Sequence, residues 1–373
     1  METKVIKLDA GNIDAAKISE AAGIIDAGGL VAFPTETVYG IACRVKRDSL
    51  RKLDELKGRS ADKYYTLHIS SKEQVEKYVP AIGLRAGKLI RNVWPGPVTI
   101  VFEMSTGDLE KQRKKLDREV FENLYRDDSI GIRCPDNPIA SGLLEATSNP
   151  IVAPSANLAG EQPAVDAGQV LERFNGLIDL VLDGGKCKYG KSSTVVRIDK
   201  NGLEILRQGA FPQSQLLESA MVKFLFVCTG NSCRSPMAEG MFKKYLAEKL
   251  SCTLDRLEEK GYKVSSAGTM GLAGLAASPE ATRACAIRGI DIGRHRSAAL
   301  SPNLLEESDL IFVLARVHRD AVIEISPQAA EKCLLLAQEK DIADPIGQTQ
   351  QVYDKCAELI EQAIKKRIGG LVL

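Results

Sequence analysis

The sequence lacks several features that mark whole classes of protein. No stretch of its 373 residues reaches 18 consecutive apolar positions, which argues against a transmembrane helix, and the first residues contain no apolar segment typical of a secretory leader. Neither a Walker motif nor a G-x-G-x-x-G segment is present. Only three histidines occur, which argues against a histidine-based metal site. Lysine and arginine (50) balance aspartate and glutamate (49), so net charge does not indicate a nucleic-acid or membrane-surface protein.

Cysteine is also sparse, with nine residues, an odd number. At least one thiol is therefore free or paired between chains, and free thiols suit a reducing compartment, so we expect a cytoplasmic protein with no membrane partner. Hydrophobic residues (44%) and charged residues (27%) occur at ordinary levels for a globular protein. The length predicts two or three domains, and short apolar runs alternating with helical periodicity predict an α/β fold.

Two stretches interrupt this alternation. Residues 103–128 are dense in charges of both signs, which indicates a solvated surface helix; contact with nucleic acid is the alternative. Residues 209–221 contain Pro212 and a short amphipathic stretch. The nearly continuous apolar run 222–227 that follows is typical of a fully buried parallel strand, so we place a domain boundary before it.

Residues 228–236, Cys-Thr-Gly-Asn-Ser-Cys-Arg-Ser-Pro, lie between this predicted strand and a predicted helix. A loop at this place turns backbone N–H groups inward, and the helix N-terminus adds positive charge, which together suit a tetrahedral dianion. Gly230 permits the turn, and Arg234 reaches back to bind two oxygens in a bidentate manner. The same field favours an ionised, nucleophilic Cys228 at neutral pH. Asp344, in a later Asp-Pro loop, is the candidate acid for the leaving group.

The segment VCTGNSCRSPMAEG resembles the low-molecular-weight protein tyrosine phosphatases, and SSAGT at 265–269, HRS at 295–297 and DPIG at 344–347 extend the resemblance to the C-terminus. The resemblance implies that Cys228 forms a phosphocysteine, that Arg234 stabilises the transition state, and that Asp344 acts first as acid and then as base. It implies a loop supported by Gly230, Asn231, Ser232, Cys233 and Ser235. It implies no metal and no cofactor, and a reversible disulfide between Cys228 and Cys233 under oxidation, with simple packing of Cys233 as the alternative.

Two positions leave the phosphatase substrate open. Ile346 follows the Asp-Pro pair, where relatives that act on phosphotyrosine usually carry an aromatic residue. Ser232 occupies the position at which members that act on phosphoarginine have Thr, and its hydroxyl can orient a P–N substrate. The prediction is therefore a phosphoprotein phosphatase acting on phosphotyrosine, with protein phosphoarginine as the alternative.

The first half carries hydroxyls and basic side chains at the ends of predicted strands, which suits a phosphate-bearing ligand. The segments are PTETVYG, KGR, WPGPVT, GIRCP, APSAN, SSTVV and ILRQG. In this order they resemble the YrdC family, the threonylcarbamoyl-AMP synthases, from about Ile6 to Gly209. The resemblance implies that L-threonine, bicarbonate and ATP are joined into threonylcarbamoyl-AMP and pyrophosphate, and that the product serves the threonylcarbamoyladenosine modification of tRNA.

This second resemblance also implies roles for individual residues. It assigns ATP contacts to Arg59, Lys63, Ser129, Ser155 and Arg207. It assigns threonine contacts to Thr35, His68, Arg133, Ala153 and Ser193, with Arg133 on the carboxylate. Mg²⁺ is expected to accompany ATP, although the sequence contains no dedicated carboxylate cage. The expected partners beyond the substrates are tRNA and tRNA-modification enzymes.

Lys63 stands where many members of the YrdC family have Asn. A lysine can serve a phosphate as a point charge, but the alternative is that the N-terminal half is a nucleotide- or RNA-binding module and only the phosphatase turns over. We thus expect a bifunctional enzyme in three parts. Residues 1–210 form a YrdC-like α/β domain with a twisted mixed sheet, residues 211–221 a linker, and residues 222–373 a doubly wound parallel-sheet phosphatase domain.

Overall fold

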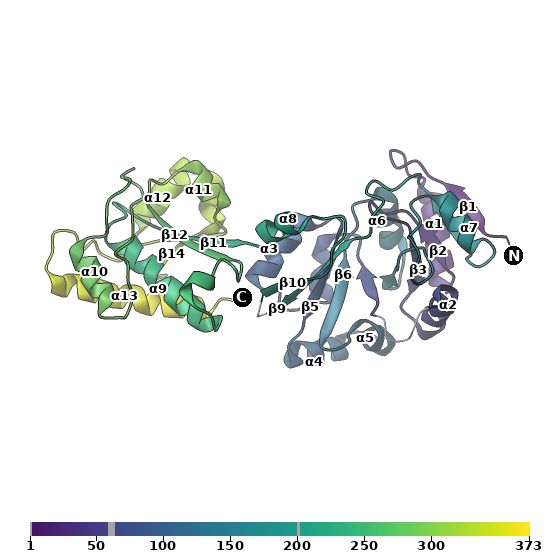
Figure 1. Cartoon of the computed structure of the whole chain (residues 1–373), viewed down its shortest axis with the longest axis horizontal. Helices are drawn as coiled ribbons and strands as arrows, with labels where there is room; N and C mark the ends of the chain where they lie inside the picture. Colours follow the sequence, from purple (N-terminus) through teal and green to yellow (C-terminus); the bar gives the residue numbers. More distant parts are fainter. Residues whose placement is uncertain (1, 59–63, 200–201) are drawn as a thin grey trace. The chain divides into compact units, whose positions relative to one another are not determined.

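The computed structural model describes residues 2–58, 64–199 and 202–373, so Arg59 and Lys63 lie outside the described residues. The chain divides into two compact units (Figure 1). The first comprises Met1–Ile82 and Ala86–Ala220, and the second comprises Gly83–Arg85 and Met221–Leu373. Within the described residues, no helix is both long enough and apolar enough to cross a membrane.

The first unit is built on a ten-stranded mixed sheet with the strand order β1-β8-β2-β3-β7-β4-β6-β5-β9-β10. Its strands are β1 Lys4–Lys7, β2 Val31–Phe33, β3 Gly40–Arg44, β4 Thr66–His68, β5 Val98–Glu103, β6 Ser129–Arg133, β7 Ile151–Val152, β8 Leu180–Asp183, β9 Thr194–Asp199 and β10 Gly202–Arg207. The pairs β1–β8, β2–β8, β4–β6 and β5–β9 are parallel, and the other neighbours are antiparallel.

Helices occupy much of the chain between these strands. They are α1 Ala15–Asp26, α2 Arg47–Lys57, α3 Leu84–Val93, α4 Thr106–Lys115, α5 Arg118–Leu124, α6 Pro138–Ala146, α7 Ala167–Phe174 and α8 Gln213–Ser219, with a 3₁₀ helix at Lys72–Lys77. Several begin where the sequence supplies a capping side chain. Asn137, for example, accepts hydrogen bonds from the first amides of α6, and Pro138 occupies the first helical position, where its missing N–H costs nothing.

The charged segment 103–128 forms two helices rather than one. Asp117 caps α5 by accepting hydrogen bonds from the N–H groups of Glu119 and Val120. The α5 side chains Val120, Phe121 and Leu124 are buried in the first unit's core. The segment is thus only partly solvated, because these apolar side chains of α5 pack into the core while the charged side chains around them remain at the surface.

The second unit contains a four-stranded parallel sheet in the order β12-β11-β13-β14. Its strands are β11 Val222–Cys228, β12 Tyr262–Gly268, β13 Leu310–Val313 and β14 Cys333–Leu335. Its helices are α9 Arg234–Lys249, α10 Pro279–Ala286, α11 Pro302–Glu307, α12 Arg316–Ile325 and α13 Gln350–Gly369, with 3₁₀ helices at Leu254–Arg256 and Pro327–Lys332. Together with the mixed sheet of the first unit, this parallel sheet confirms the predicted fold class.

Strand β11 explains why the run 222–227 is apolar throughout. Phe224 and Phe226 belong to one hydrophobic cluster, whereas the alternating Leu225 and Val227 belong to another. Since successive side chains of a strand point to opposite faces, both faces of the sheet are covered at β11. This rigid central strand ends at Cys228.

The stretch 211–221, expected as a linker, contains helix α8. Leu216 and Ala220 are fully buried in the hydrophobic core of the first unit. The side-chain amide of Asn92 donates to the carbonyl of Ser219 at 2.9 Å, which fixes the end of the helix. The structure therefore assigns residues 211–220 to the first unit and Met221 to the second.

Candidate active sites

The first unit contains a cavity of about 300 Å³ in which most of the motif residues meet. We call it the basic cavity; its described lining residues are Thr35, Val38, Tyr39, Gly40, Lys57, Tyr64, Thr66, His68, Thr99, Arg133, Ala153, Pro154, Ser155, Asn157, Ala159, Gly160, Ser192, Ser193, Val195 and Arg207. They include three cationic side chains, those of Lys57, Arg133 and Arg207, and none of these described residues is acidic. Such a lining suits a ligand that carries several negative charges.

Sheet register brings Arg133 and His68 together. The parallel strands β4 and β6 end side by side, with His68 opposite Arg133. The His68 side chain is buried, its Nδ1 lies 3.1 Å from the carbonyl of Thr66, and burial together with the Arg133 charge lowers its pKa to about 3. The imidazole is therefore neutral at physiological pH, and Arg133 provides the positive charge at this end of the basic cavity.

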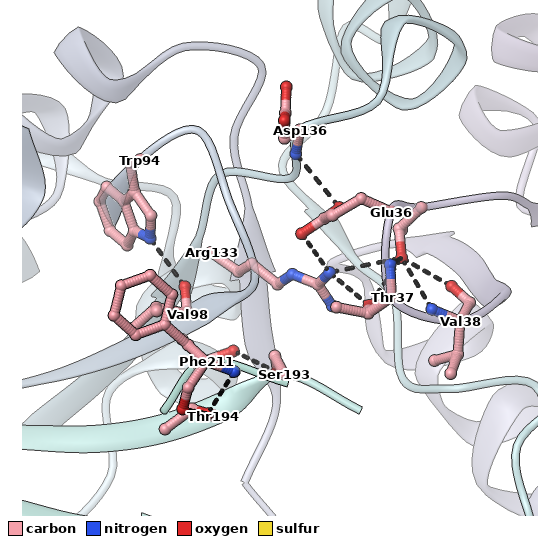
Figure 2. Close-up of polar contacts among 12 residues, drawn as sticks. Glu36, Thr37, Val38, Trp94, Val98, Arg133, Asp136, Ser193, Thr194 and Phe211 are labelled. Carbon is pink, nitrogen blue, oxygen red and sulfur yellow. Dashed lines mark hydrogen bonds and ion pairs between the residues drawn. The ribbon is translucent and has the colours of Figure 1, made fainter. Parts of the chain in front are cut away.

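Arg133 is held by a set of buried oxygens (Figure 2). Its Nη2 donates to Glu36 Oε1 at 3.0 Å, to Thr37 Oγ1 at 2.5 Å and to Thr35 Oγ1 at 3.3 Å. The other Glu36 oxygen accepts the backbone N–H of Asp136 at 3.1 Å. The Nε of Arg133 is buried and has no hydrogen-bond partner among the described residues. The guanidinium thus retains donor capacity for a carboxylate or phosphate ligand.

Arg207 and Ser193 form a second group in the basic cavity. Arg207 Nη2 donates to the Ser193 carbonyl at 2.9 Å and to its hydroxyl at 3.2 Å, and Ser193 Oγ lies 3.0 Å from Thr99 Oγ1. Burial, and next the charge of Arg133, lower the pKa of Arg207. The repulsion between the two arginines favours binding of an anion near both of them.

The Pro-Ser-Ala-Asn turn supplies the opposite wall. Ser155 Oγ donates to Asn157 Oδ1 at 2.6 Å, and Lys57 Nζ donates to the backbone carbonyls of Ser155 and Asn157. Ala153 directly follows β7 and contributes to the lining. Lys57 thereby fixes the turn that brings Ser155 and Asn157 to the cavity lining.

The basic cavity thus contains Thr35, His68, Arg133, Ala153, Ser155, Ser193 and Arg207 from the residues predicted at sequence level. It does not contain Ser129, which begins the strand that Arg133 ends and whose hydroxyl donates to the carbonyl of Arg126. Four residues of extended strand separate the two positions by about 13 Å. The role of Ser129 in ATP binding therefore stays a prediction, as do those of Arg59 and Lys63.

Sequence reasoning missed three groups of this site, namely Glu36, Thr37 and Thr99. All three are buried polar residues inside the PTETVYG and WPGPVT segments. A buried carboxylate requires a cationic partner, so Glu36 within an otherwise uncharged segment was a usable signal.

The second unit places Cys228 at the end of β11 and Arg234 at the start of α9, so residues 228–235 form a tight loop. Cys228 Sγ lies 2.9 Å from Ser235 Oγ. Burial raises the pKa of the Cys228 thiol, whereas hydrogen bonds from Ser235 and Asn231 and the charge of Arg234 lower it. The pKa of Cys228 is raised overall, because burial outweighs the positive field that was expected to ionise this thiol.

Asn231, rather than Gly230, adopts the special backbone conformation of the loop. Its φ of 51° lies in the left-handed region, which Asn tolerates better than most residues, whereas Gly230 has no positive φ. The Asn231 side chain donates to Ser235 Oγ and Ser266 Oγ at 2.8 Å each and accepts the N–H of Ala298. The expected role of Gly230 in making the turn therefore belongs to Asn231.

Arg234 is almost fully buried and its guanidinium has three partners. Nη1 donates to the carbonyl of Ile342 at 3.0 Å, and Nη2 donates to Thr229 Oγ1 at 3.1 Å and to Asp344 Oδ2. Asp344 accepts the N–H of Ile346 through its other oxygen. The predicted nucleophile, cation and acid therefore lie around one loop, and the acid pairs with the cation.

Cys233 and Ser232 complete the loop. Both thiols, Cys228 and Cys233, are free. Cys233 Sγ lies 3.3 Å from the hydroxyl of Tyr353 and 3.6 Å from Ser232 Oγ. Burial raises the pKa of Tyr353 to about 12, so its hydroxyl remains protonated beneath the loop.

Residues 23–209, half of the chain, match the family model of the Sua5, YciO and YrdC proteins, which carries the description "Telomere recombination". The chain belongs to the Sua5/YciO/YrdC family. Residues 223–371 match the model of the low molecular weight phosphotyrosine protein phosphatases. Both resemblances found in the sequence are thus confirmed, and this Sua5/YciO/YrdC member carries a phosphatase domain after its family domain.

Individual relatives support the first of these assignments. A Sua5/YciO/YrdC relative in Pyrococcus abyssi, named threonylcarbamoyl-AMP synthase, is 37% identical over 201 residues, 54% of this chain and 56% of the relative. The protein of the same name in Bacillus subtilis is 32% identical over 228 residues, 60% of this chain and 62% of the relative. The chain therefore spans less than two thirds of the length of either curated relative. A solved structure of P. abyssi Sua5 complexed with L-threonine is similar with a TM-score of 0.52 and 25% identity, covering 71% of this chain and 92% of that one.

Proposed function

We propose that the first unit is a threonylcarbamoyl-AMP synthase that joins L-threonine, bicarbonate and ATP, releases pyrophosphate and serves tRNA modification. The observation that carries this proposal is the basic cavity, with three cationic side chains and no acidic residue among its described lining. In this proposal Arg133 binds the threonine carboxylate, because its guanidinium lines the basic cavity and the neutral His68 beside it leaves Arg133 as the cation at this end. The P. abyssi protein of the same family was solved with L-threonine bound.

In this proposal Arg207 binds ATP phosphates, while Lys57, whose Nζ donates to the carbonyls of Ser155 and Asn157, holds the turn beside them. A carboxylate and a triphosphate held close together repel each other, so the reaction needs cations on both, and Arg133 and Arg207 provide one for each. The described lining offers no carboxylate cage for Mg²⁺. An ion entering with ATP would be held by the phosphate oxygens.

The test is threonine-dependent pyrophosphate release from ATP in the presence of bicarbonate. Arg207→Ala is expected to reduce this activity by about 10-fold or more, since one charge-assisted contact to a phosphate is lost. Arg118→Ala is the matched control, because its side chain is 87% exposed and pairs only with Glu122 among the described residues. Folded protein that binds ATP or RNA but releases no pyrophosphate would overturn the synthase proposal in favour of a binding module.

We propose that the second unit is a phosphomonoesterase with a phosphocysteine intermediate. Cys228 Sγ attacks phosphorus, the S–P bond forms as the bond to the leaving oxygen breaks, and Asp344 gives that oxygen its proton. Water then cleaves the S–P bond and returns its proton to Asp344. The arrangement around one loop supports this proposal, because Cys228 contacts Ser235 at the start of α9 and the adjacent Arg234 pairs with Asp344.

The raised pKa of Cys228 bears on the first step. The thiol must lose its proton before attack, and a bound phosphoryl dianion can accept it, since phosphate monoesters titrate near neutral pH. The hydroxyl of Ser235, 2.9 Å from the sulfur, then stabilises the thiolate.

Phosphotyrosine is the proposed substrate residue, and phosphoarginine in proteins is the second candidate. Two positions favour the second: Ile346, 62% exposed beside the acid, offers no aromatic ring for stacking, and Ser232 places a hydroxyl in the loop. The kcat/KM values on both phosphoamino acids decide between them, with Ser232→Ile as the variant that should depress phosphoarginine hydrolysis selectively. Activity on phosphotyrosine alone, unchanged in Ser232→Ile, would remove the second candidate.

The two activities are separable by mutation. Cys228→Ser is expected to abolish hydrolysis of p-nitrophenyl phosphate and to leave pyrophosphate release unchanged, because the two sites lie in different units. Cys252→Ser, at a partly exposed cysteine away from the loop, is the control and should retain both activities. Loss of both activities in Cys228→Ser with an intact fold would contradict two independent sites.

A further inference from the structure

The guanidinium of Arg234 must keep its position while its partners change. In the structure it contacts the Ile342 carbonyl, the Thr229 hydroxyl and Asp344. During the proposed reaction Asp344 turns to the leaving group and a phosphoryl oxygen takes its place. The Asp344 side chain is 35% exposed, which leaves it room to do so. Thr229 is then the side chain, among those that contact Arg234, that can hold it throughout the reaction.

The Thr229 hydroxyl is itself fixed from the other side. His318, near the start of α12, lies with its Nε2 2.9 Å from Thr229 Oγ1. Since a guanidinium only donates, Thr229 Oγ1 accepts from Arg234 and its own hydrogen can point to an unprotonated Nε2. The result is a chain of two hydrogen bonds that joins His318, Thr229 and Arg234.

The burial of His318 is energetically unfavourable apart from its contact with Thr229. Its side chain is 2% exposed, and its Nδ1 is buried with no hydrogen-bond partner among the described residues. A buried polar atom without a partner is unfavourable, and an apolar side chain would fill the same space without that cost. Burial and the Arg234 charge lower the pKa of His318 to about 4, against the opposing influence of Asp344 and Asp341. The imidazole is therefore neutral and can act as acceptor.

We propose that His318 is a positioning residue of the phosphatase site, which acts through the Thr229 hydroxyl to hold Arg234 in line for the transferring phosphoryl group. The inference rests on the proposed phosphatase function. Neither residue touches the substrate in this scheme, so removing either should weaken transition-state stabilisation and leave ground-state phosphate binding nearly intact.

The test is a double-mutant cycle on the full chain with Thr229→Val and His318→Leu. Each single variant is expected to lower kcat on p-nitrophenyl phosphate by about 10- to 100-fold, as misplacement of a catalytic group by a fraction of an ångström does. Inhibition by orthovanadate, which resembles the transition state, should weaken in parallel, whereas inhibition by inorganic phosphate should change less than about threefold. The double variant should be no slower than Thr229→Val alone, because both changes break one chain.

Two rescue variants and one control separate positioning from loss of fold. Thr229→Ser retains the hydroxyl and His318→Gln retains an acceptor at nearly the same reach, so both should recover most of kcat. Thr253→Val, before the 3₁₀ helix Leu254–Arg256, should leave kcat unchanged. Alkylation of Cys228 by iodoacetamide should proceed at the wild-type rate in Thr229→Val, which shows that the nucleophile is intact.

The outcomes are distinct. A wild-type chain without Cys228-dependent hydrolysis would overturn the phosphatase proposal and with it this inference. An active wild type with Thr229→Val within twofold of its kcat, or with additive losses in the double variant, would overturn the inference alone. If His318→Leu does not fold, the Thr229→Val and Thr229→Ser pair still decides whether the hydroxyl positions Arg234.

Discussion

Each unit buries an arginine against a carboxylate, yet the two carboxylates differ. The side chains of Arg133 and Glu36 are 8% and 3% exposed, whereas those of Arg234 and Asp344 are 5% and 35% exposed. Glu36 also accepts a backbone N–H from Asp136. Among the described residues, the hydrogen-bond partners of Asp344 are Arg234 and the N–H of Ile346 in its own loop. The buried Glu36 therefore has a structural role, because it holds Arg133 in position. Asp344 is reached by water, so it can exchange a proton and change its hydrogen-bond partners.

The largest expected effect concerns the exposed carboxylate. Asp344→Asn should lower kcat on a phosphotyrosine substrate by about 10²- to 10⁴-fold, because no acid is left to protonate the leaving oxygen. The loss should shrink with p-nitrophenyl phosphate, whose leaving group needs a proton less. Steady-state kinetics on both substrates check this, and equal losses on the two would rule out Asp344 as the acid.

The buried carboxylate should matter most for stability. Glu36→Ala leaves Arg133 buried without its ion-pair partner, so the free energy of unfolding of the first unit should fall by about 3–5 kcal/mol. Asp344→Ala should cost the second unit about 1 kcal/mol or less, because water reaches that side of the pair. Urea denaturation of both variants measures the difference. Equal losses of unfolding free energy in the two variants would contradict the expectation that the more buried carboxylate contributes more to stability.

Acid should destabilise both units through their buried histidines. The folded-state pKa values of His68 and His318, about 3 and about 4, lie below the unfolded value of 6.5, so the unfolded chain binds more protons as pH falls below 6.5. Between pH 6.5 and 5, each unit should lose about 2 kcal/mol. Urea denaturation across this range checks the slope. His68→Gln and His318→Gln should flatten it in the first and second unit respectively, and an unchanged slope would mean that these histidines are not the groups that titrate.

The smallest effects belong to the hydroxyls behind each arginine site. Thr99→Val removes one of the partners of Ser193 Oγ, and Tyr353→Phe removes the hydroxyl 3.3 Å from Cys233 Sγ. Each should lower the free energy of unfolding of its own unit by about 1 kcal/mol, the typical net value of one hydrogen bond. Thermal unfolding measures both. A loss above about 3 kcal/mol in either would point to a wider rearrangement.

The parts of each site that are local in sequence could be predicted. The short spacing between Cys228 and Arg234, after a buried strand, predicts a tight strand-to-helix loop. The structure has that loop between the end of β11 and the start of α9. Arg133 and Arg207 could be collected in the same way, because each is the last residue of a strand. Both sets depend on local backbone geometry, which short motifs encode well.

The pairings that cross the sheet could not be predicted. Glu36 meets Arg133, and Arg207 meets Ser193 and Thr99, only because strand order and register bring distant segments together. The protonation of Cys228 depends on the balance between burial and local hydrogen bonds, which a motif does not contain. Asn231 took the role expected of Gly230 because its side chain can bond to the loop as well as tolerate a positive φ.

Helix α8 determines where the chain can be divided for separate expression of the two units. Expression of the first unit alone has to include α8, because Leu216 and Ala220 would otherwise be missing from its core. Ending the chain at residue 210 would open a cavity where Leu216 lies, at a cost of about 2–5 kcal/mol. A split after Ala220 keeps the helix with the first unit, so that unit extends ten residues beyond its predicted end at residue 210.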